Sequence, residues 1–247
     1  DALRRAKFAY AVPNYSNPTG ALVPTAARQA LLDDVIETGT WLVEDDPYLP
    51  LQFDGDAGPS ILALHGRMEP DGAYGGPVIY LGTLSKSIVP GMRVGWVVAE
   101  AGMIQTLALA KQSSDIASSI LTQAVALELL ESGIEETHVP RIVNEYRKRR
   151  DALCASAARH LGEWFEWETP PGGMFVWMKA IGGAIDTDAL YQVALQEKVA
   201  FVPGSVFDPA GRDRTAMRVN FTRSSPEVIE EGCRRLAAAT RRYLAER

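Results

Sequence analysis

The sequence has little of what would assign it to a disulfide-rich, membrane or secreted class. It contains two cysteines, Cys154 and Cys233, far apart and each in a helical pattern. We therefore expect reduced thiols in or near a core, and neither a disulfide nor a metal site. No apolar run approaches the ~18 residues of a membrane span, and residues 1–10 lack a signal-peptide pattern. These absences predict a cytoplasmic protein that has no membrane partner.

An excess of positive charge is also absent. Acidic residues outnumber Lys and Arg by 31 to 25, which gives a net charge of -6 and an isoelectric point near 5.2. Such a chain has no basic stripe that could displace counterions from phosphates, so no nucleic-acid partner is expected. Apolar residues are plentiful, at 47% of the 247 residues, and suffice for a sizeable core in one or two domains.

In the first part of the chain, short apolar runs alternate with helical patterns. Strands are predicted at residues 8–13, 40–43, 78–84 and 94–99, and a helix at 25–38 that ends at Gly39. Residues 54–76 are rich in glycine, proline and acids and predict a loop. Buried-type strands joined by helices or crossovers imply a mainly parallel sheet with flanking helices, so the predicted fold class is α/β.

The second part of the chain has a different order. Helices are predicted at 103–113, 119–132 and 134–161, the last interrupted at most by Pro140 near its start. Strands at 165–168, 174–179, 200–202 and 217–221 then alternate with helices at 187–198 and 226–245. We place a domain boundary near Gly133. Residues 1–133 then form part of a large domain and residues 134–247 a smaller α+β C-terminal domain.

The stretch YLGTLSKSIVPGMRVGW, residues 80–96, carries the clearest chemical signal. Lys86 lies in a tight turn at the end of a predicted strand, close to Thr83 and Ser85, and Arg93 follows. A lysine in a partly dry site near another cation has a lowered pKa and becomes a nucleophile. Hydroxyls and a guanidinium fork are the donors that a phosphate dianion needs. The stretch could therefore hold an aldehyde by its carbonyl group and a phosphate by its oxygens.

Three acids followed by Pro-Tyr stand at the end of the second predicted strand. Acids at the carboxyl end of a strand lie where open α/β sheets bind ligands. We expect Glu44 and Asp46 to form a solvated loop.

Several short segments together resemble the fold-type I pyridoxal-phosphate-dependent aminotransferases, in particular the branch of 2-aminoadipate and aromatic aminotransferases. They occur in that family's order and are NPTG at 17–20, DDPY at 45–48, the lysine turn with Arg93, PGGMF at 171–175 and MRVNF at 217–221. The likeness covers the chain from Tyr10 onward. It implies a fold-type I transferase in which pyridoxal 5'-phosphate is the cofactor, an amino acid and a 2-oxo acid are the substrates, and the assembly is a homodimer.

The resemblance also implies a role for individual residues. Lys86 would bind the cofactor covalently and shuttle a proton at the substrate α-carbon. Asp45 would pair with the pyridine nitrogen and Tyr48 would meet the phenolic oxygen, so these three are the predicted catalytic residues.

The same resemblance implies the remaining binding residues. Asn17 would donate to the phenolic oxygen and lie beside the substrate. Thr83, Ser85 and Arg93 would bind the phosphate, and Arg218 would grip the substrate α-carboxylate with its guanidinium fork. No metal is implied.

Two other functions stay open. One is a transcription regulator with an aminotransferase-like effector domain, and the intact Asn17 and Pro47-Tyr48 favour the enzyme over it. The other is a lyase or decarboxylase on the same fold. The family's first half has no counterpart here, so the resemblance implies the C-terminal half of a longer protein, with an exposed sheet edge.

Overall fold

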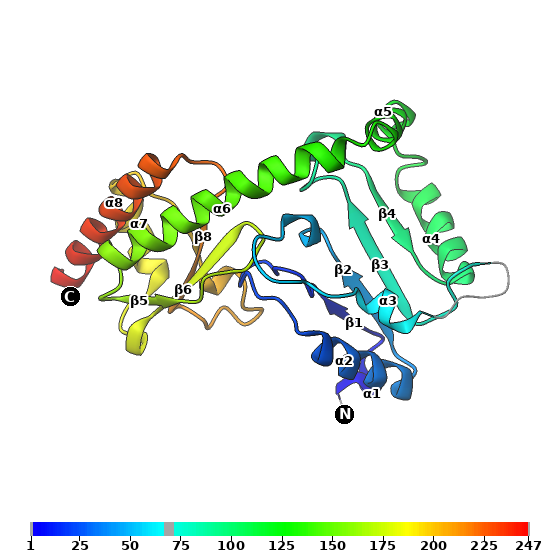
Figure 1. Cartoon of the computed structure of the whole chain (residues 1–247). Helices are drawn as coiled ribbons and strands as arrows, with labels where there is room; N and C mark the ends of the chain where they lie inside the picture. The colour runs from blue at the N-terminus through cyan, green and yellow to red at the C-terminus, as the bar shows by residue number, and fades with distance from the viewer. Residues whose placement is uncertain (1, 67–71, 247) are drawn as a thin grey trace. The chain divides into compact units, whose positions relative to one another are not determined.

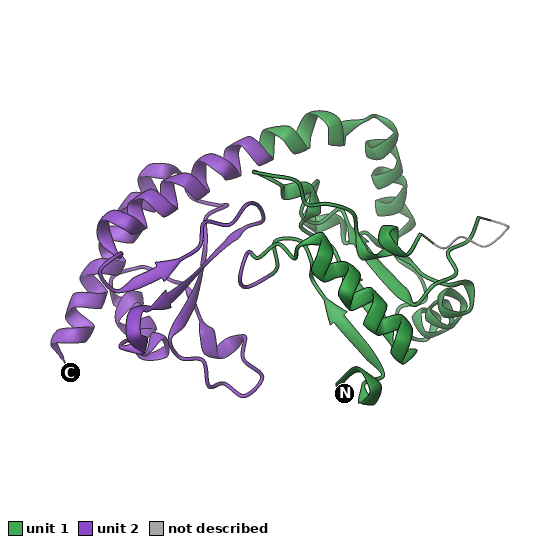
Figure 2. Ribbon diagram, turned by 60° about the horizontal axis from the view of Figure 1, so that its bottom comes forward, with its two compact units in different colours: residues 1–16, 21–142 green, residues 17–20, 143–247 purple. Residues whose placement is uncertain are grey.

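Two four-stranded sheets, one in each of two units, organise the chain (Figures 1 and 2). The computed structural model describes residues 2–66 and 72–246. Unit 1 comprises residues 1–16 and 21–142, and unit 2 comprises residues 17–20 and 143–247. The division falls within the long helix α6 (Ile134–His160), which begins directly after Gly133, the predicted boundary.

The sheet of unit 1 is mainly parallel, as predicted. Its strands, in spatial order, are β1 (Phe8–Ala11), β2 (Trp41–Asp45), β3 (Val78–Thr83) and β4 (Gly95–Val98). β1, β2 and β3 run parallel, and β4 runs antiparallel to β3. Because parallel strands end at the same edge of a sheet, the loops that follow β1, β2 and β3 meet at one edge.

Among the residues that the structure describes, the α-helices that belong wholly to unit 1 are α1 (Ala2–Arg5), α2 (Thr25–Thr38), α3 (Ile61–His65), α4 (Ala101–Ser114) and α5 (Ile120–Glu131). Gly39 ends α2 with a left-handed φ of 67°, as the sequence predicts. Side chains of α2, α3, β2 and β3 form a core with Leu32, Val35, Leu42, Ile61 and Val78. The prediction of a loop over 54–76 is wrong for Ile61–His65, which form α3; residues 67–71 of that prediction lie outside the described residues.

Unit 2 has the predicted α+β arrangement. Its antiparallel strands, in spatial order, are β5 (Phe165–Trp167), β6 (Phe175–Ala180), β8 (Ala216–Asn220) and β7 (Val202–Pro203). Besides most of α6, the unit contains α7 (Thr187–Gln196) and α8 (Pro226–Ala245). Buried Met178, Met217, Leu190 and Leu236 contribute to its interior.

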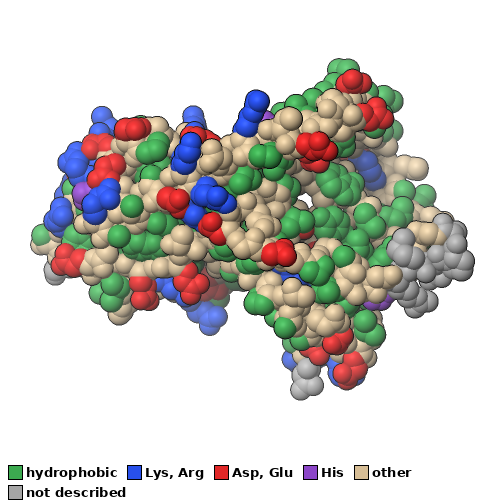
Figure 3. Space-filling model, in the orientation of Figure 1, with side chains coloured by type: hydrophobic (Ala, Val, Ile, Leu, Met, Phe, Trp, Pro, Cys, Tyr) green, Lys and Arg blue, Asp and Glu red, His purple; other side chains and the backbone are tan. Residues whose placement is uncertain are grey.

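The state of the two cysteines and the distribution of surface charge can be compared with what the composition predicts. Cys154 is half-buried and Cys233 is buried, and both are free thiols, as predicted. On the face in Figure 3, acidic and basic side chains are interspersed and form no continuous basic patch. Within the described residues, no helix is both long and apolar enough to cross a membrane.

Candidate active site

The lysine turn follows directly from β3. The Ile88 and Val89 amides both donate to the Leu84 carbonyl, at 2.9 and 3.1 Å, which closes one tight turn around Lys86. Lys86 itself is half-buried. The strand end and this turn therefore hold the lysine at the carboxyl edge of the parallel strands, where the sequence places it.

Two hydroxyls lie side by side at the start of this turn. Thr83 Oγ1 lies 3.0 Å from Ser85 Oγ and accepts from the Ser85 amide at 3.1 Å. Thr83 Oγ1 also lies within donating distance, 3.1 Å, of the Val94 carbonyl, so the segment that enters β4 is tied to the end of β3. Arg93 precedes Val94 and is exposed, with a left-handed φ of 56°. The turn thus holds the two hydroxyls side by side, and Arg93 follows them in the chain.

Asp45 ends β2 and pairs with Leu81 of β3. Its Oδ2 accepts a hydrogen bond from the hydroxyl of Tyr10, a residue of β1. Burial, followed by this hydrogen bond and the Asp45 charge, raises the pKa of Tyr10 to about 12. The Tyr48 side chain, three residues after Asp45, is buried. Tyr10 was not predicted as a site residue, because only the alignment of β1 with β2 brings it to Asp45.

The prediction that Glu44 and Asp46 form a solvated loop is wrong. Their exposed fractions are 0% and 3%. Glu44 accepts from the Ile61 and Leu62 amides, at 2.8 and 2.9 Å, at the start of α3. Burial raises the pKa of both carboxyls, although each accepts hydrogen bonds that act in the opposite direction, Glu44 from these two amides and Asp46 from other groups. Side chains alternate along a strand, so residues 44 and 46 point to the interior and Asp45 to the opposite face.

The other two predicted residues, Asn17 and Arg218, meet in unit 2. Arg218 Nη1 donates to Asn17 Oδ1 at 2.6 Å. The guanidinium carbon of Arg218 lies 4.2 Å from the ring centre of Phe175 and 4.9 Å from that of Phe207, within cation–π range. Phe175 is the aromatic residue of the PGGMF segment. This segment therefore packs its aromatic ring against the guanidinium of Arg218 from β8.

The NPTG loop packs closely on the same segment. Gly20 has a φ of 69°, and a Cβ added there would lie 2.8 Å from Pro170 Cβ and 2.9 Å from the Phe175 carbonyl oxygen. A side chain at this position would clash, which explains the glycine of NPTG. The Asn17-Pro18 peptide bond is cis.

The predicted residues therefore form two groups. Unit 1 brings six of them to the carboxyl edge of β2 and β3, namely Asp45, Tyr48, Thr83, Ser85, Lys86 and Arg93. Unit 2 pairs Asn17 with Arg218. Among the described residues, no cluster of His, Cys, Asp and Glu is suited to a metal ion.

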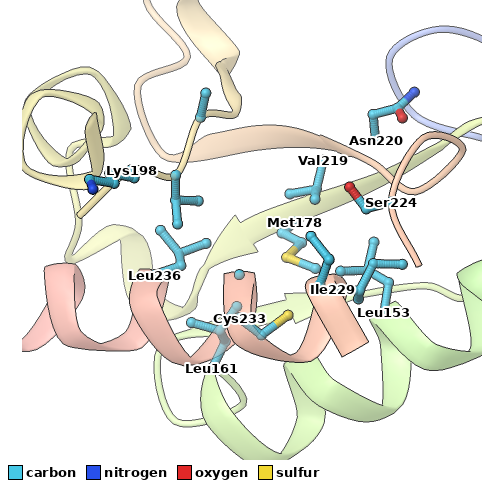
Figure 4. A pocket seen from close by; sticks show the side chains of 14 residues that line it. Leu153, Leu161, Met178, Lys198, Val219, Asn220, Ser224, Ile229, Cys233 and Leu236 are labelled. Atoms are coloured by element: carbon cyan, nitrogen blue, oxygen red, sulfur yellow. The ribbon is translucent and has the colours of Figure 1, made fainter. Parts of the chain in front are cut away.

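A cavity of about 210 Å³ lies elsewhere in unit 2 (Figure 4). Met178 and Val219 line it from the sheet, and Ile229, Cys233 and Leu236 line it from α8. None of the predicted site residues lines it. This cavity is an apolar gap between the sheet and α8, and the predicted chemistry lies outside it.

Known proteins match nearly the whole chain. The family model of aminotransferase class I and II matches residues 3–236. The chain is 38% identical over 241 residues to the 2-aminoadipate transaminase of Thermus thermophilus, covering 98% of this chain and 59% of that protein. It is 36% identical over 234 residues to aromatic-amino-acid aminotransferase 1 of Thermococcus litoralis, covering 95% of this chain and 54% of that protein.

A solved structure gives the same result. The crystal structure of α-aminoadipate aminotransferase from Thermus thermophilus, complexed with N-(5'-phosphopyridoxyl)-L-leucine, matches with a TM-score of 0.90 at 36% identity. The match covers 100% of this chain and 62% of that chain, so our chain spans a little over half the length of these relatives. Agreement in sequence and in backbone along almost all of its length shows that the chain belongs to the class I and II aminotransferase family.

Proposed function

We propose that the protein is a pyridoxal-phosphate-dependent aminotransferase that moves an amino group between an amino acid and a 2-oxo acid. The observation that carries this proposal is the placement of Asp45, Tyr48 and Lys86 at one edge of the parallel strands. Family membership supports it, as does the phosphopyridoxyl ligand in the structure of the Thermus relative.

The donor set fits the chemical parts of pyridoxal phosphate. Thr83, Ser85 and Arg93 offer two hydroxyls and a guanidinium, which suit a phosphate dianion. The Asp45 carboxylate suits a protonated pyridine nitrogen, and the phenol of Tyr48 suits the ring oxygen. In unit 2, the amide of Asn17 offers a further donor for that ring oxygen.

These residues have separate tasks in the proposed reaction. When bound, pyridoxal phosphate withdraws electron density from the substrate α-carbon. Lys86 Nζ would hold the cofactor through its carbonyl group and, as a free amine, would take up the proton from the substrate α-carbon. Asp45 holds the proton on the pyridine nitrogen. Arg218 orients the substrate through two parallel hydrogen bonds to its α-carboxylate.

The named activities of the relatives suggest where to look for substrates. We propose 2-aminoadipate and aromatic amino acids as the first amino donors to test, with 2-oxo acids as acceptors. We further propose a homodimer in the cytoplasm. The regulator is not favoured, since Asn17 and Tyr48 both keep the identities that the enzyme needs.

Labelling of Lys86 tests the proposed function. Full-length protein incubated with pyridoxal phosphate and then reduced with borohydride should carry the cofactor on Lys86, because only an amine bound to its carbonyl carbon is fixed by reduction. Peptide mapping by mass spectrometry locates the label. Lys86→Arg serves as the control and should remain unlabelled. A label on another lysine, or none, would refute the assignment.

A further inference from the structure

A chain of buried polar side chains lies behind the Asp45–Tyr48 turn, in the interior of unit 1. Arg28 of α2 and Asn14 are both 0% exposed, and Asp46 is 3% exposed. Arg28 Nη2 donates to Asn14 Oδ1 at 2.7 Å, and Asn14 Nδ2 donates to Asp46 Oδ1 at 2.9 Å. The amide of Asn14 therefore links a buried cation to a buried carboxyl group through one hydrogen bond at each end.

Each end of this chain is tied to other segments as well. Arg28 also donates to the carbonyls of Val23 and Pro59, at 2.8 and 2.9 Å. At the other end, Asp46 accepts from the Leu49 amide and from the Tyr80 hydroxyl of β3, the latter at 3.3 Å. The β1–α2 loop, the loop before α3, the turn after β2 and strand β3 thus converge on the side chains of Arg28 and Asp46.

A buried charge is expensive in this position. Desolvation of a carboxylate costs several kcal/mol unless hydrogen bonds and an opposite charge compensate it. A protein in which apolar side chains of similar size replace such buried charges is often at least as stable. The same interior also holds the carboxyl of Glu44. A carboxyl at residue 46 is therefore more easily explained by what it positions than by stability.

What Asp46 can position follows from its place in the chain. The Asp46 amide donates to the Leu81 carbonyl at 3.0 Å, which extends the pairing of β2 with β3 one residue beyond Asp45. Its side chain accepts from the Leu49 amide, which closes the turn around Tyr48. With residue 46 fixed to the interior, strand alternation directs Asp45 to the opposite face.

We propose that Asp46 is a positioning residue, which acts with Asn14 and Arg28 to fix the turn that presents Asp45 and Tyr48 to the cofactor. The cofactor part of this inference rests on the proposed function. The rigidity of the turn does not, so the two can be tested separately.

The first test uses the protein without cofactor. In Asp46→Asn, one carboxylate oxygen becomes an NH2 group, which cannot accept a hydrogen bond. If the new side chain keeps its oxygen toward Asn14, its NH2 group faces Tyr80 and Leu49, and the Leu49 backbone amide loses its acceptor. Hydrogen exchange of residues 46–51, followed by mass spectrometry, should accelerate by about tenfold or more. Asp34→Asn, which removes an exposed acid of α2, is the matched control and should leave this exchange unchanged.

A swapped pair makes the test specific to the chain of buried side chains. In Asn14→Asp/Asp46→Asn, the carboxylate lies next to Arg28, and the amide at 46 can donate to it while its oxygen accepts from Leu49 and Tyr80. The swap should restore slow exchange. If cofactor binds, the swap should also restore its affinity and its absorption spectrum, whereas Asp46→Asn should weaken affinity about tenfold and shift the pH midpoint of that spectrum.

The outcomes separate the two ideas. Wild-type exchange and a wild-type spectrum in Asp46→Asn would overturn the proposal, and so would a folded swapped variant as impaired as the single one. If Asp46→Asn does not fold, Tyr80→Phe, which removes one donor to Asp46, should give the faster exchange, and unchanged exchange there would overturn the proposal. Failure of wild type to bind pyridoxal phosphate would refute the proposed function alone.

Discussion

The Arg218 guanidinium is held by the side-chain amide of Asn17 and by the rings of Phe175 and Phe207. A lysine at this position would lose the planar geometry on which these contacts depend. In Arg218→Lys, a point charge replaces a planar fork that can make two parallel bonds to a carboxylate. Loss of one charge-assisted bond, about 1.5–3 kcal/mol, predicts a roughly ten- to hundredfold fall in kcat/KM for amino acids. Single-turnover kinetics with a panel of amino acids, at saturating cofactor, measures this.

The control for that substitution lies four residues earlier. Arg214 is exposed and pairs with Asp186 at 2.9 Å. Arg214→Lys should therefore leave kcat/KM unchanged. Because Arg218 has no proposed contact with the cofactor, the absorbance of bound cofactor should be the same in both variants. Equal rates for Arg218→Lys and wild type would remove Arg218 from the carboxylate site.

At the residue scale, the family resemblance separates Asp45 from its neighbours, but the sequence places those neighbours wrongly in a solvated loop. Glu44 accepts hydrogen bonds from backbone amides of α3, and Asp46 accepts one from the side chain of Asn14, in the loop that follows β1. These groups lie far from residues 44–46 in the chain and become neighbours only when the strands pair. Tyr10 is not predicted from the sequence for the same reason, because its contact with Asp45 joins two different strands.

At the element scale, the helices with strong local signals were predicted well. The predicted bounds of α8, 226–245, agree with the structure, where Ser225 caps the helix and Pro226 occupies its first turn. Helix α3 was missed because it has five residues and is stabilised partly by Glu44 of β2. A helix that depends on a distant carboxylate leaves little local pattern to read.

Glu230 of α8 joins α8 to α6 and should make unfolding depend on pH. Hydrogen bonds from Ser156, His160 and Arg159 lower the pKa of Glu230 from 4.5 to about 2. A carboxyl with a lower pKa in the folded state stabilises the fold above its unfolded value and loses this effect as pH falls. Glu230→Gln should lower the melting temperature at pH 7, and the difference from wild type should shrink between about pH 4.5 and about pH 2.

A neighbouring residue provides the control for this prediction. Glu231 also has its pKa lowered to about 2, but its partners Arg234 and Arg235 lie on the same helix. Pairs within one exposed helix contribute little to tertiary stability. Glu231→Gln should therefore cause a smaller loss at pH 7. Equal losses in thermal melts of the two variants would contradict a role for Glu230 in joining the helices.

At the scale of the whole molecule, unit 1 leaves much apolar surface uncovered. Within the described residues, β1 and β4 each pair with another strand on one side only. Helix α4 buries none of its residues, and Ile116, Ile120 and Leu121, around the start of α5, are 82%, 80% and 74% exposed. Open strand edges and grouped apolar side chains favour association between copies of a chain.

This surface predicts self-association of the 247-residue chain in solution. Ile116→Asn/Ile120→Glu/Leu121→Glu should weaken this association. Each apolar side chain that is no longer buried in an interface reduces the free energy of association by on the order of 1 kcal/mol. The association constant should then fall by about tenfold or more, measured by sedimentation velocity. Asparagine suits residue 116, whose φ is 62°.

The control variant adds the same charge to exposed apolar residues of unit 2, as Ile181→Asn/Leu195→Glu/Val206→Glu. Both variants lower the net charge from -6 to -8, two added acids in each, so general charge repulsion affects them equally. Only the unit 1 variant should lose association and the binding of a hydrophobic dye. An equal decrease in both would mean that net charge, and not the apolar surface around the start of α5, governs the behaviour of the chain.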